Sequence, residues 1–173
     1  INTKPYSVIY NGCDTKLFYP LTGYKNSDKI KIVTHHWSNN MCKGYQLYYD
    51  LWLFCKESSV FEFVFIGNNV PDMFSEVPKI GPYAHSELSE HLNDCDIYIT
   101  DSIWDSCPNH IIEGLMCGLP MLYTDHEGGG RELCNLPLDS IGEKFTDFNS
   151  MIKGLYKIVY NYDYYKQNVL KHR

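Results

Sequence analysis

The near-continuous apolar run Phe61–Ile66 (F-E-F-V-F-I), which ends at Gly67-Asn68, restricts the possible folds most. A strand with one face in water alternates apolar and polar residues, whereas this run is typical of a strand covered on both faces in a parallel sheet. Other short apolar or β-branched runs also predict strands. The expected strands are Ser7–Tyr10, Lys29–Thr34, Phe61–Ile66, a short one within Val77–Tyr83, Asp96–Thr100 and Met121–Tyr123.

Segments with helical periodicity fill the intervals between these strands. In Lys43–Lys56, aromatic and leucine residues recur three or four positions apart, which predicts an amphipathic helix. Strands that alternate with helices indicate an α/β domain with a Rossmann-like parallel sheet and helices on both faces. The other expected helices are Ser86–Asn93, one that begins near Pro108 and is stopped by Gly118 and Pro120, Arg131–Cys134, Phe148–Tyr160 and Tyr162–His172.

Loops that follow parallel strands gather at one edge of a sheet. Right-handed crossovers place them at the carboxyl ends of the strands, where open α/β sheets bind ligands. We therefore expect one crevice lined by the loops His35–Cys42, Gly67–Asn69, Asp101–Pro108 and Thr124–Gly130.

The stretch from Asp105 to Pro120 (D-S-C-P-N-H-I-I-E-G-L-M-C-G-L-P) carries the residues best suited to ligand binding. Pro108 suits a first helical turn, and Ser106 can cap free backbone donors. The carboxylates of Asp105 and Glu113 flank this helix N-terminus, whose N–H groups favour an anion. The arrangement suits a phosphorylated, hydroxyl-bearing ligand. A helix-capping Asp and a solvated Glu are the alternative reading.

Charge and cysteine content exclude several other classes of protein. The net charge of −6 and the absence of a basic patch argue against nucleic acid as a partner. The seven cysteines form no C-x-x-C pair, so we expect free thiols in a reducing compartment. No signal peptide and no run of about 18 apolar residues is present, so we expect a cytoplasmic domain without a transmembrane segment.

Two patterns near the start of the chain resemble motifs of one enzyme family. Val8–Phe18 (V-I-Y-N-G-C-D-T-K-L-F) resembles the stretch "V-I-x-N-G-V-D-x-x-x-F" of GT-B glycosyltransferases of the GT4 type, where it opens the C-terminal, donor-binding domain. Lys43-Gly44 resembles the "K-G" that starts the next helix in that family.

Three further patterns follow in the order that the family has them. The spacing of Asp105 and Glu113 resembles its E-x7-E motif, with Asp in place of the first Glu. Glu113–Pro120 (E-G-L-M-C-G-L-P) resembles "E-A-M-A-C-G-x-P", and Gly128–Glu132 (G-G-G-R-E) resembles "G-G-x-x-E". Together the five patterns extend over nearly the whole chain.

The resemblance implies the C-terminal half of a GT-B fold and a retaining glycosyltransferase that uses a nucleotide-sugar donor. Residues 1–28 would be the linker and lead-in segment, and residues 29–173 the nucleotide-sugar-binding domain. The chain starts at Ile1 without an initiator Met, so we expect a fragment that lacks the N-terminal domain, which would bind most of a glycan or lipid-linked acceptor. The fragment alone is expected to be inactive, to need no metal or cofactor, and to be cytoplasmic, peripheral to the membrane only in a full-length protein.

The resemblance also implies roles for individual residues. Glu113 would accept hydrogen bonds from the ribose hydroxyls, because a carboxylate has acceptor capacity for two adjacent O–H donors. Lys43 would neutralise the departing diphosphate, and Asp105 would contact the donor sugar; these two are the expected catalytic residues. The expected donor-binding residues are Glu113, Ser38, Gly67, Tyr83, the Ser106, Cys107 and Asn109 backbone at the β-phosphate, and Gly128 and Gly129 near the sugar.

The sequence departs from the family at one cationic position. The family has an Arg five or six positions before the Lys, where this chain has Ser38 and Trp37, so His36, Ser38 or Asn39 would substitute for it in part. The alternative hypotheses are a catalytically inactive nucleotide-sugar-binding module and an epimerase-type isomerase. Asp94-Cys95-Asp96 has the D-x-D form of a metal site, but we expect it at the opposite edge of the sheet as a helix end and a strand start.

Overall fold

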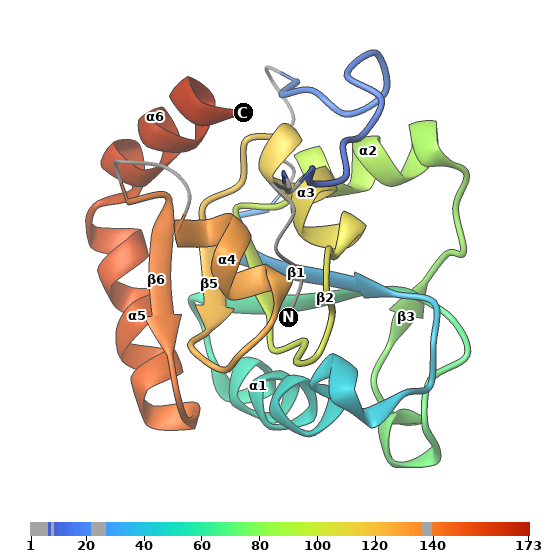
Figure 1. Ribbon diagram of the computed structural model, residues 1–173. Helices are drawn as coiled ribbons and strands as arrows, with labels where there is room; N and C mark the ends of the chain where they lie inside the picture. The colour runs from blue at the N-terminus through green and yellow to red at the C-terminus, as the bar shows by residue number, and fades with distance from the viewer. Residues whose placement is uncertain (1–6, 8, 22–26, 136–139) are drawn as a thin grey trace.

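The computed structural model describes residues 7, 9–21, 27–135 and 140–173. Its centre is one six-stranded sheet in the order β3-β2-β1-β4-β5-β6, and all of its strand pairs are parallel (Figure 1). The α/β fold with a Rossmann-like parallel sheet is therefore confirmed. The strands are β1 (Ile30–His36), β2 (Phe61–Gly67), β3 (Lys79–Ile80), β4 (Ile97–Thr100), β5 (Met121–Thr124) and β6 (Gly142–Phe145).

Helices connect the strands, and each of the predicted helices is present. The predicted bounds of the last two are confirmed to the residue, and the others differ by a few positions. The helices are η1 (Met41–Lys43), α1 (Tyr45–Glu57), η2 (Asp72–Phe74), α2 (His85–Asn93), α3 (Asn109–Met116), α4 (Gly129–Asn135), α5 (Phe148–Tyr160) and α6 (Tyr162–His172), of which η1 and η2 are single 3-10 turns.

Side chains that alternate along the strands build two apolar layers, one on each face of the sheet. In β1, Ile32 packs with the layer under α1 and α5, and Val33 packs with the layer under α2, α3 and α4. The same alternation separates Ile97 and Ile99 from Tyr98 in β4. Both faces of the central strands are covered, which is why their sequences are almost continuously apolar.

The structure corrects several local predictions. Ser7, Ile9 and Tyr10 form no strand; the Ile9 side chain is exposed, and Val8 lies outside the described residues. His35 and His36 belong to β1 and are buried, so the loop after this strand is shorter than predicted. The first helix begins at Tyr45, after the η1 turn.

The start of α3 and the last strand also differ from expectation. Pro108 is the N-cap residue of α3 and not its first helical residue, and no side chain, that of Ser106 included, caps this end. The polar edge strand β6 (G-E-K-F) was not predicted. It pairs with β5 alone, and its residues alternate only in part between buried and exposed.

The seven cysteines are free thiols, and four of them are buried. Cys55, Cys95, Cys117 and Cys134 contribute to the two apolar layers. In these layers burial raises the pKa of the Cys55 and Cys117 thiols to about 12. These side chains therefore act as apolar packing groups.

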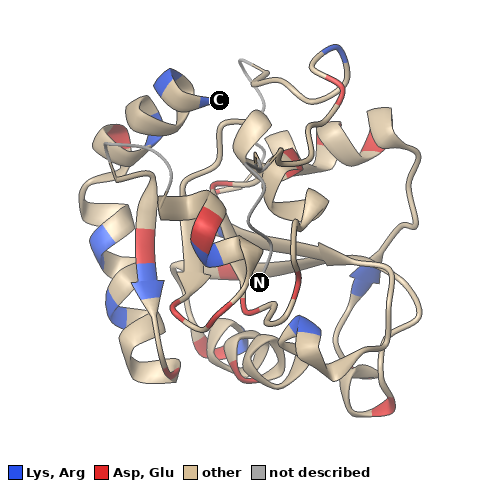
Figure 2. Cartoon of the chain, in the orientation of Figure 1, with Lys and Arg blue, Asp and Glu red and all other residues tan. Residues whose placement is uncertain are grey.

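Lysines and arginines are spread over separate elements and interleaved with acidic residues (Figure 2). No helix in the described ranges is both long and apolar enough to cross a bilayer.

Candidate functional site: a crevice at the ends of β1 and β4

The strand order reverses between β1 and β4, since the chain runs outward from β1 to β3 and then returns to start β4 beside β1. Open parallel sheets bind ligands at this switch point, outside the carboxyl ends of the strands. A cavity of about 460 Å³ lies there. Its walls come from the end of β1, η1, the loop after β4 and the first turns of α3. The lining residues are His35, His36, Trp37, Ser38, Lys43, His85, Asp105, Cys107, Pro108, Asn109, His110 and Glu113.

The structure brings most of the predicted site residues to this cavity. Lys43, Asp105 and Glu113 line it, although the sequence separates Lys43 from Glu113 by 70 positions. The other predicted residues that line it are Ser38, Cys107 and Asn109. The predicted crevice is thus present as a geometric feature.

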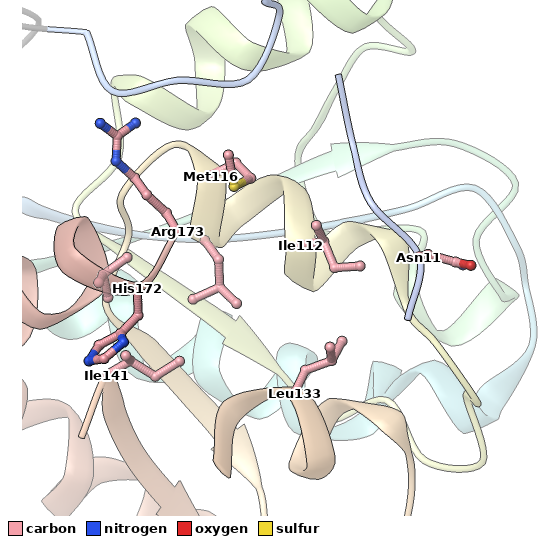
Figure 3. A pocket seen from close by; sticks show the side chains of 9 residues that line it. Asn11, Ile112, Met116, Leu133, Ile141, His172 and Arg173 are labelled. Atoms are coloured by element: carbon pink, nitrogen blue, oxygen red, sulfur yellow. The ribbon is translucent and has the colours of Figure 1, made fainter. Parts of the chain in front are cut away.

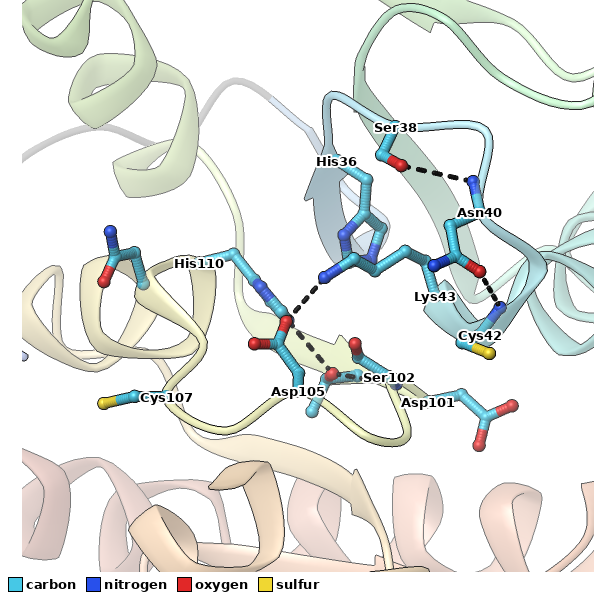
Figure 4. A network of polar contacts seen from close by, with 12 residues as sticks. His36, Ser38, Asn40, Cys42, Lys43, Asp101, Ser102, Asp105, Cys107 and His110 are labelled. Atoms are coloured by element: carbon cyan, nitrogen blue, oxygen red, sulfur yellow. Dashed lines mark hydrogen bonds and ion pairs between the residues drawn. The ribbon is translucent and has the colours of Figure 1, made fainter. Parts of the chain in front are cut away.

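Lys43 and Asp105 form an ion pair across the cavity. The Lys43 Nζ atom lies 2.5 Å from Asp105 Oδ2, and both side chains are about three-quarters buried (Figure 4). A lysine just before a helix is disfavoured by the helix dipole, so an anionic partner is expected there. In the ligand-free chain this partner is Asp105.

Gly44 fixes the approach of Lys43 to the site. Its φ of 90° is left-handed, and a Cβ on it would lie 2.5 Å from Asp101 Cβ. The Gly44 N–H also closes the η1 turn by donating to the Met41 carbonyl. The Lys-Gly pair therefore has a steric basis, because only glycine lets η1 turn into α1 against the loop after β4.

Glu113 lies on the second turn of α3 and is held by a histidine. Its Oε2 atom lies 2.7 Å from His35 Nε2, and its side chain is 14% exposed, on the cavity side. On the other side of the imidazole, Nδ1 lies 3.0 Å from the Tyr98 hydroxyl. Glu113 is therefore not the solvated helix residue of the alternative reading.

Two further histidines form the floor of the cavity. His36 Nε2 lies 3.3 Å from the Tyr48 hydroxyl and from the Thr34 hydroxyl, and His110 Nε2 lies 3.2 Å from the Thr100 hydroxyl. Burial, followed by the neighbouring imidazoles and the proximity of Lys43, lowers the pKa of His36 and His110 well below the usual value of 6.5. Both rings are therefore neutral at pH 7, and His36 does not replace the positive charge of an arginine.

The segment before the first strand reaches the N-terminus of α3. Asn11 donates from its side chain to the Cys107 carbonyl at 3.2 Å and to Asn109 Oδ1 at 2.9 Å. Its backbone N–H approaches the Cys107 sulfur at 3.1 Å. Asn11 of the first motif thus helps to hold the predicted phosphate-binding segment.

A second cavity, of about 800 Å³, lies on the other side of Asp105. The Gly129 N–H donates to the Asp105 carbonyl at 2.6 Å, and a Cβ on Gly129 would lie 2.3 Å from the Ser106 oxygen. The glycines of the loop after β5 therefore permit contact between two backbones. The residues that line this cavity are Trp104, Asp105, Ser106, Glu127, Gly128, Gly129, Arg131, Glu132 and Asn135.

Two predicted donor-binding residues are not among those that line either cavity. Gly67 is the last residue of β2, and a Cβ on it would lie 1.9 Å from the His36 oxygen. Packing within the sheet therefore explains why this position is a glycine. The Tyr83 ring stacks on His91 with centroids 4.1 Å apart. Their roles in nucleotide binding stay predictions.

Sequence reasoning missed the structural role of the histidines and of Trp104. The signal for His35 and His36 was present, since they directly follow a β-branched strand and continue its alternation. For His110 the signal was its position on the predicted helix, directly after the expected donor-binding residue Asn109. Trp104 is 74% exposed with a left-handed φ of 60°, and nothing in its sequence context indicates this conformation.

An apolar cavity of about 190 Å³ lies apart from these groups, between α3, α4 and α6 (Figure 3). Ile112, Met116, Leu133 and Ile141 form apolar parts of its wall, and Asn11, His172 and Arg173 also line it.

The D-x-D pair lies where the sequence places it. Asp94 caps the end of α2 and binds Lys31 at 2.5 Å, and Asp96 precedes β4 and accepts from the Lys31 N–H. Within the described ranges no three His, Cys, Asp or Glu side chains are grouped as metal ligands would be.

Solved structures share this fold. The C-terminal domain of a group 1 family glycosyl transferase, LpcC from Francisella tularensis, matches 91% of the chain over 94% of its own length, with 17% identity and a TM-score of 0.73. The chain has the fold of a GT-B C-terminal domain. The resemblance indicated by the motifs is therefore confirmed at the level of the fold.

Two larger proteins match this C-terminal-domain fold over part of their chains. Sucrose-phosphate synthase from Thermosynechococcus elongatus matches 92% of the chain with 15% identity and a TM-score of 0.71, and the chain spans about half of that enzyme (46%). HepE from Anabaena, solved in complex with UDP-glucose, matches 94% with 15% identity and a TM-score of 0.67, over 50% of its length. No family model and no curated protein matches the sequence.

Proposed function

We propose that the chain is the donor-binding domain of a retaining glycosyltransferase and binds a nucleotide-diphosphate sugar at the β1–β4 crevice. The observation that carries this proposal is the arrangement of Lys43, Asp105 and Glu113 around one cavity at the N-terminus of α3. A cation, a helix N-terminus and a carboxylate are the groups that a diphosphate linked to a ribose would need in one site. The shared fold and the UDP-glucose in the HepE structure support the same proposal.

Each residue would have one role in donor binding. Glu113 would accept the ribose hydroxyls, and the backbone of Ser106, Cys107 and Asn109 would meet the β-phosphate. Lys43 would stabilise the charge that develops on the departing diphosphate. Asp105 stands between the two cavities, so the donor sugar would lie beside it, with Gly128 and Gly129 as the facing wall.

In this arrangement the residues 29–173 form the nucleotide-sugar-binding unit, with residues 1–28 leading into it. An N-terminal domain would bind most of a glycan or lipid-linked acceptor and close over the crevice. No step in this proposal passes through a metal ion, because Lys43 supplies the positive charge at the diphosphate.

Titration calorimetry of UDP, GDP and ADP onto the chain tests this proposal. Loss of the Glu113 carboxylate in Glu113→Ala removes up to two charge-assisted hydrogen bonds, so the dissociation constant should rise roughly 10- to 100-fold. The control is Glu90→Ala, which removes an exposed carboxylate of α2 outside the cavity and should leave binding unchanged. If no nucleoside diphosphate binds the wild-type chain, or if Glu113→Ala binds as tightly, the proposal is wrong.

A second candidate function, an inactive nucleotide-sugar-binding module, has support from one observation. The neutral imidazole of His36 lies where a positive charge would assist the diphosphate, so the site has less charge to stabilise a leaving group. The assay that separates the two functions joins the chain to an N-terminal acceptor domain and measures sugar transfer. Binding without release of the nucleoside diphosphate would favour the inactive module.

A further inference from the structure

Tyr98, His35 and Glu113 form a continuous chain of hydrogen bonds from the centre of the sheet to the cavity. Tyr98 lies in the middle of β4, His35 near the end of β1, and Glu113 on α3, so three separate elements meet in it. We infer that Tyr98 and His35 are positioning residues that hold the Glu113 carboxylate in the orientation needed to select a ribose over a deoxyribose. This inference rests on the proposed nucleotide site.

The hydrogen bonds around Tyr98 define which nitrogen of His35 carries the proton. The His35 backbone N–H donates to the Tyr98 hydroxyl oxygen at 3.3 Å. The hydroxyl can then donate its proton to His35 Nδ1, 3.0 Å away. A neutral imidazole that accepts at Nδ1 carries its proton on Nε2, which donates to Glu113 Oε2 at 2.7 Å. Tyr98 thus selects the tautomer that can hold Glu113.

Packing keeps this chain of groups in one geometry. The Tyr98 side chain is fully buried, and that of His35 is 1% exposed, so water does not compete for their hydrogen bonds. Gly114 makes room for the tyrosine ring, because a Cβ at this position would lie 2.6 Å from Tyr98 Cδ2. Gly114, the residue after Glu113, therefore leaves the space that the Tyr98 ring occupies.

The orientation of the carboxylate decides what it can bind. With Oε2 held by His35, the Oε1 atom and the remaining lone pair of Oε2 are left to accept two hydroxyl protons. Two adjacent acceptors suit the two hydroxyls of a ribose, and a 2′-deoxyribose leaves one of them without its donor. A carboxylate free to rotate would lose most of this discrimination, because fixed geometry is what makes paired recognition selective.

The test compares Tyr98→Phe with the wild-type chain. This change removes one oxygen from a fully buried ring that cannot touch a ligand. Calorimetry gives the dissociation constants for UDP, GDP and ADP and for their 2′-deoxy counterparts. In the wild type the ribose form should bind more tightly, and in Tyr98→Phe the ratio of the two constants should shrink by about five-fold, the factor that corresponds to one hydrogen bond of about 1 kcal/mol.

A merely structural role for Tyr98 would weaken both forms equally and leave the ratio unchanged. The matched control is Tyr165→Phe, in the apolar layer on the opposite face of the sheet, which removes a hydroxyl that donates to Glu143 and should not alter the ratio. His35→Asn is the second variant, and its ratio should also shrink. Neither change should act in a Glu113→Ala background, since the carboxylate that they position is then absent.

The outcomes separate this inference from the proposed function. If the wild type binds no nucleoside diphosphate, the proposed site and this inference are both wrong. If the wild type prefers the ribose form but Tyr98→Phe and His35→Asn keep the same ratio, the nucleotide site stands and the positioning role is wrong.

Discussion

Gly44 is the residue whose replacement should damage the site most directly through the backbone. Its left-handed φ and the Asp101 Cβ, 2.5 Å from where its own Cβ would be, mean that Gly44→Ala must distort η1 or the loop after β4. We expect a loss of about 1–3 kcal/mol in the free energy of unfolding. Urea denaturation measures this loss. Gly12→Ala is the control, because no atom lies within 4 Å of its Cβ position, and it should change stability little.

Single residues of the site could be predicted from the sequence where a motif identifies them. Lys43, Asp105 and Glu113 line one cavity as predicted, because each lies in the loop before a helix or in its first two turns. His35 was not assigned to Glu113, since a contact between β1 and α3 depends on the strand order and not on local spacing. The fit between Gly114 and Tyr98 also depends on packing that no periodicity reveals.

At the scale of elements, the pair formed by Lys43 and Asp105 connects the start of α1 to the loop before α3. The Asp105 carboxylate competes with a bound diphosphate for the ammonium group and also repels it. We therefore expect Asp105→Asn to bind a nucleoside diphosphate without a sugar several-fold more tightly, since like charges at close range disfavour each other. Calorimetry with UDP measures the effect.

Asp125→Asn is the matched control for that change. Its carboxylate pairs with Arg131 and Lys144, not with Lys43, so binding of UDP should stay the same. Weaker binding by Asp105→Asn would mean that Asp105 orients Lys43 for the phosphates and does not compete with them.

The elements that sequence reasoning placed wrongly are those at the margins of the sheet. Phe61–Ile66 was recognisable because burial on both faces leaves a continuous apolar run, whereas β6 (G-E-K-F) is a polar edge strand with one partner. The apolar residues of Ser7–Tyr10 predicted a strand, but Ile9 is exposed and the segment continues to Asn11, which binds the start of α3 instead. Edge and lead-in segments depend on tertiary contacts, which local patterns do not encode.

At the scale of the whole molecule, the parallel sheet determines which ionisable side chains are buried. The cavity floor contains neutral histidines because β1 and α3 bury them, and Asp101 is partly buried nearby in the loop after β4. Burial raises the pKa of Asp101 to about 6 and lowers the pKa of His36 and His110 well below 6.5. In each of the three groups, folding therefore shifts the pKa in the direction that favours the neutral form. These shifts make the free energy of unfolding depend on pH.

The signs of the contributions differ between the histidines and the aspartate. As the pH falls below 6.5, the unfolded chain protonates His36 and His110 while the folded chain does not, so stability falls by roughly 1.4 kcal/mol per pH unit for each histidine. Asp101 acts in the opposite direction between about pH 6 and 4, because there the folded chain binds its proton and the unfolded chain does not.

Replacement of the aspartate should therefore reveal the full effect of the histidines. As the pH falls from 6 to 5, we expect the free energy of unfolding of Asp101→Asn to fall more steeply than that of the wild type. The difference between the two slopes should be roughly 1.4 kcal/mol per pH unit, which corresponds to one proton. Urea denaturation at a series of pH values measures both slopes. Equal slopes would mean that Asp101 ionises over the same pH range in the folded and the unfolded chain, so that its partial burial in the loop after β4 does not raise its pKa.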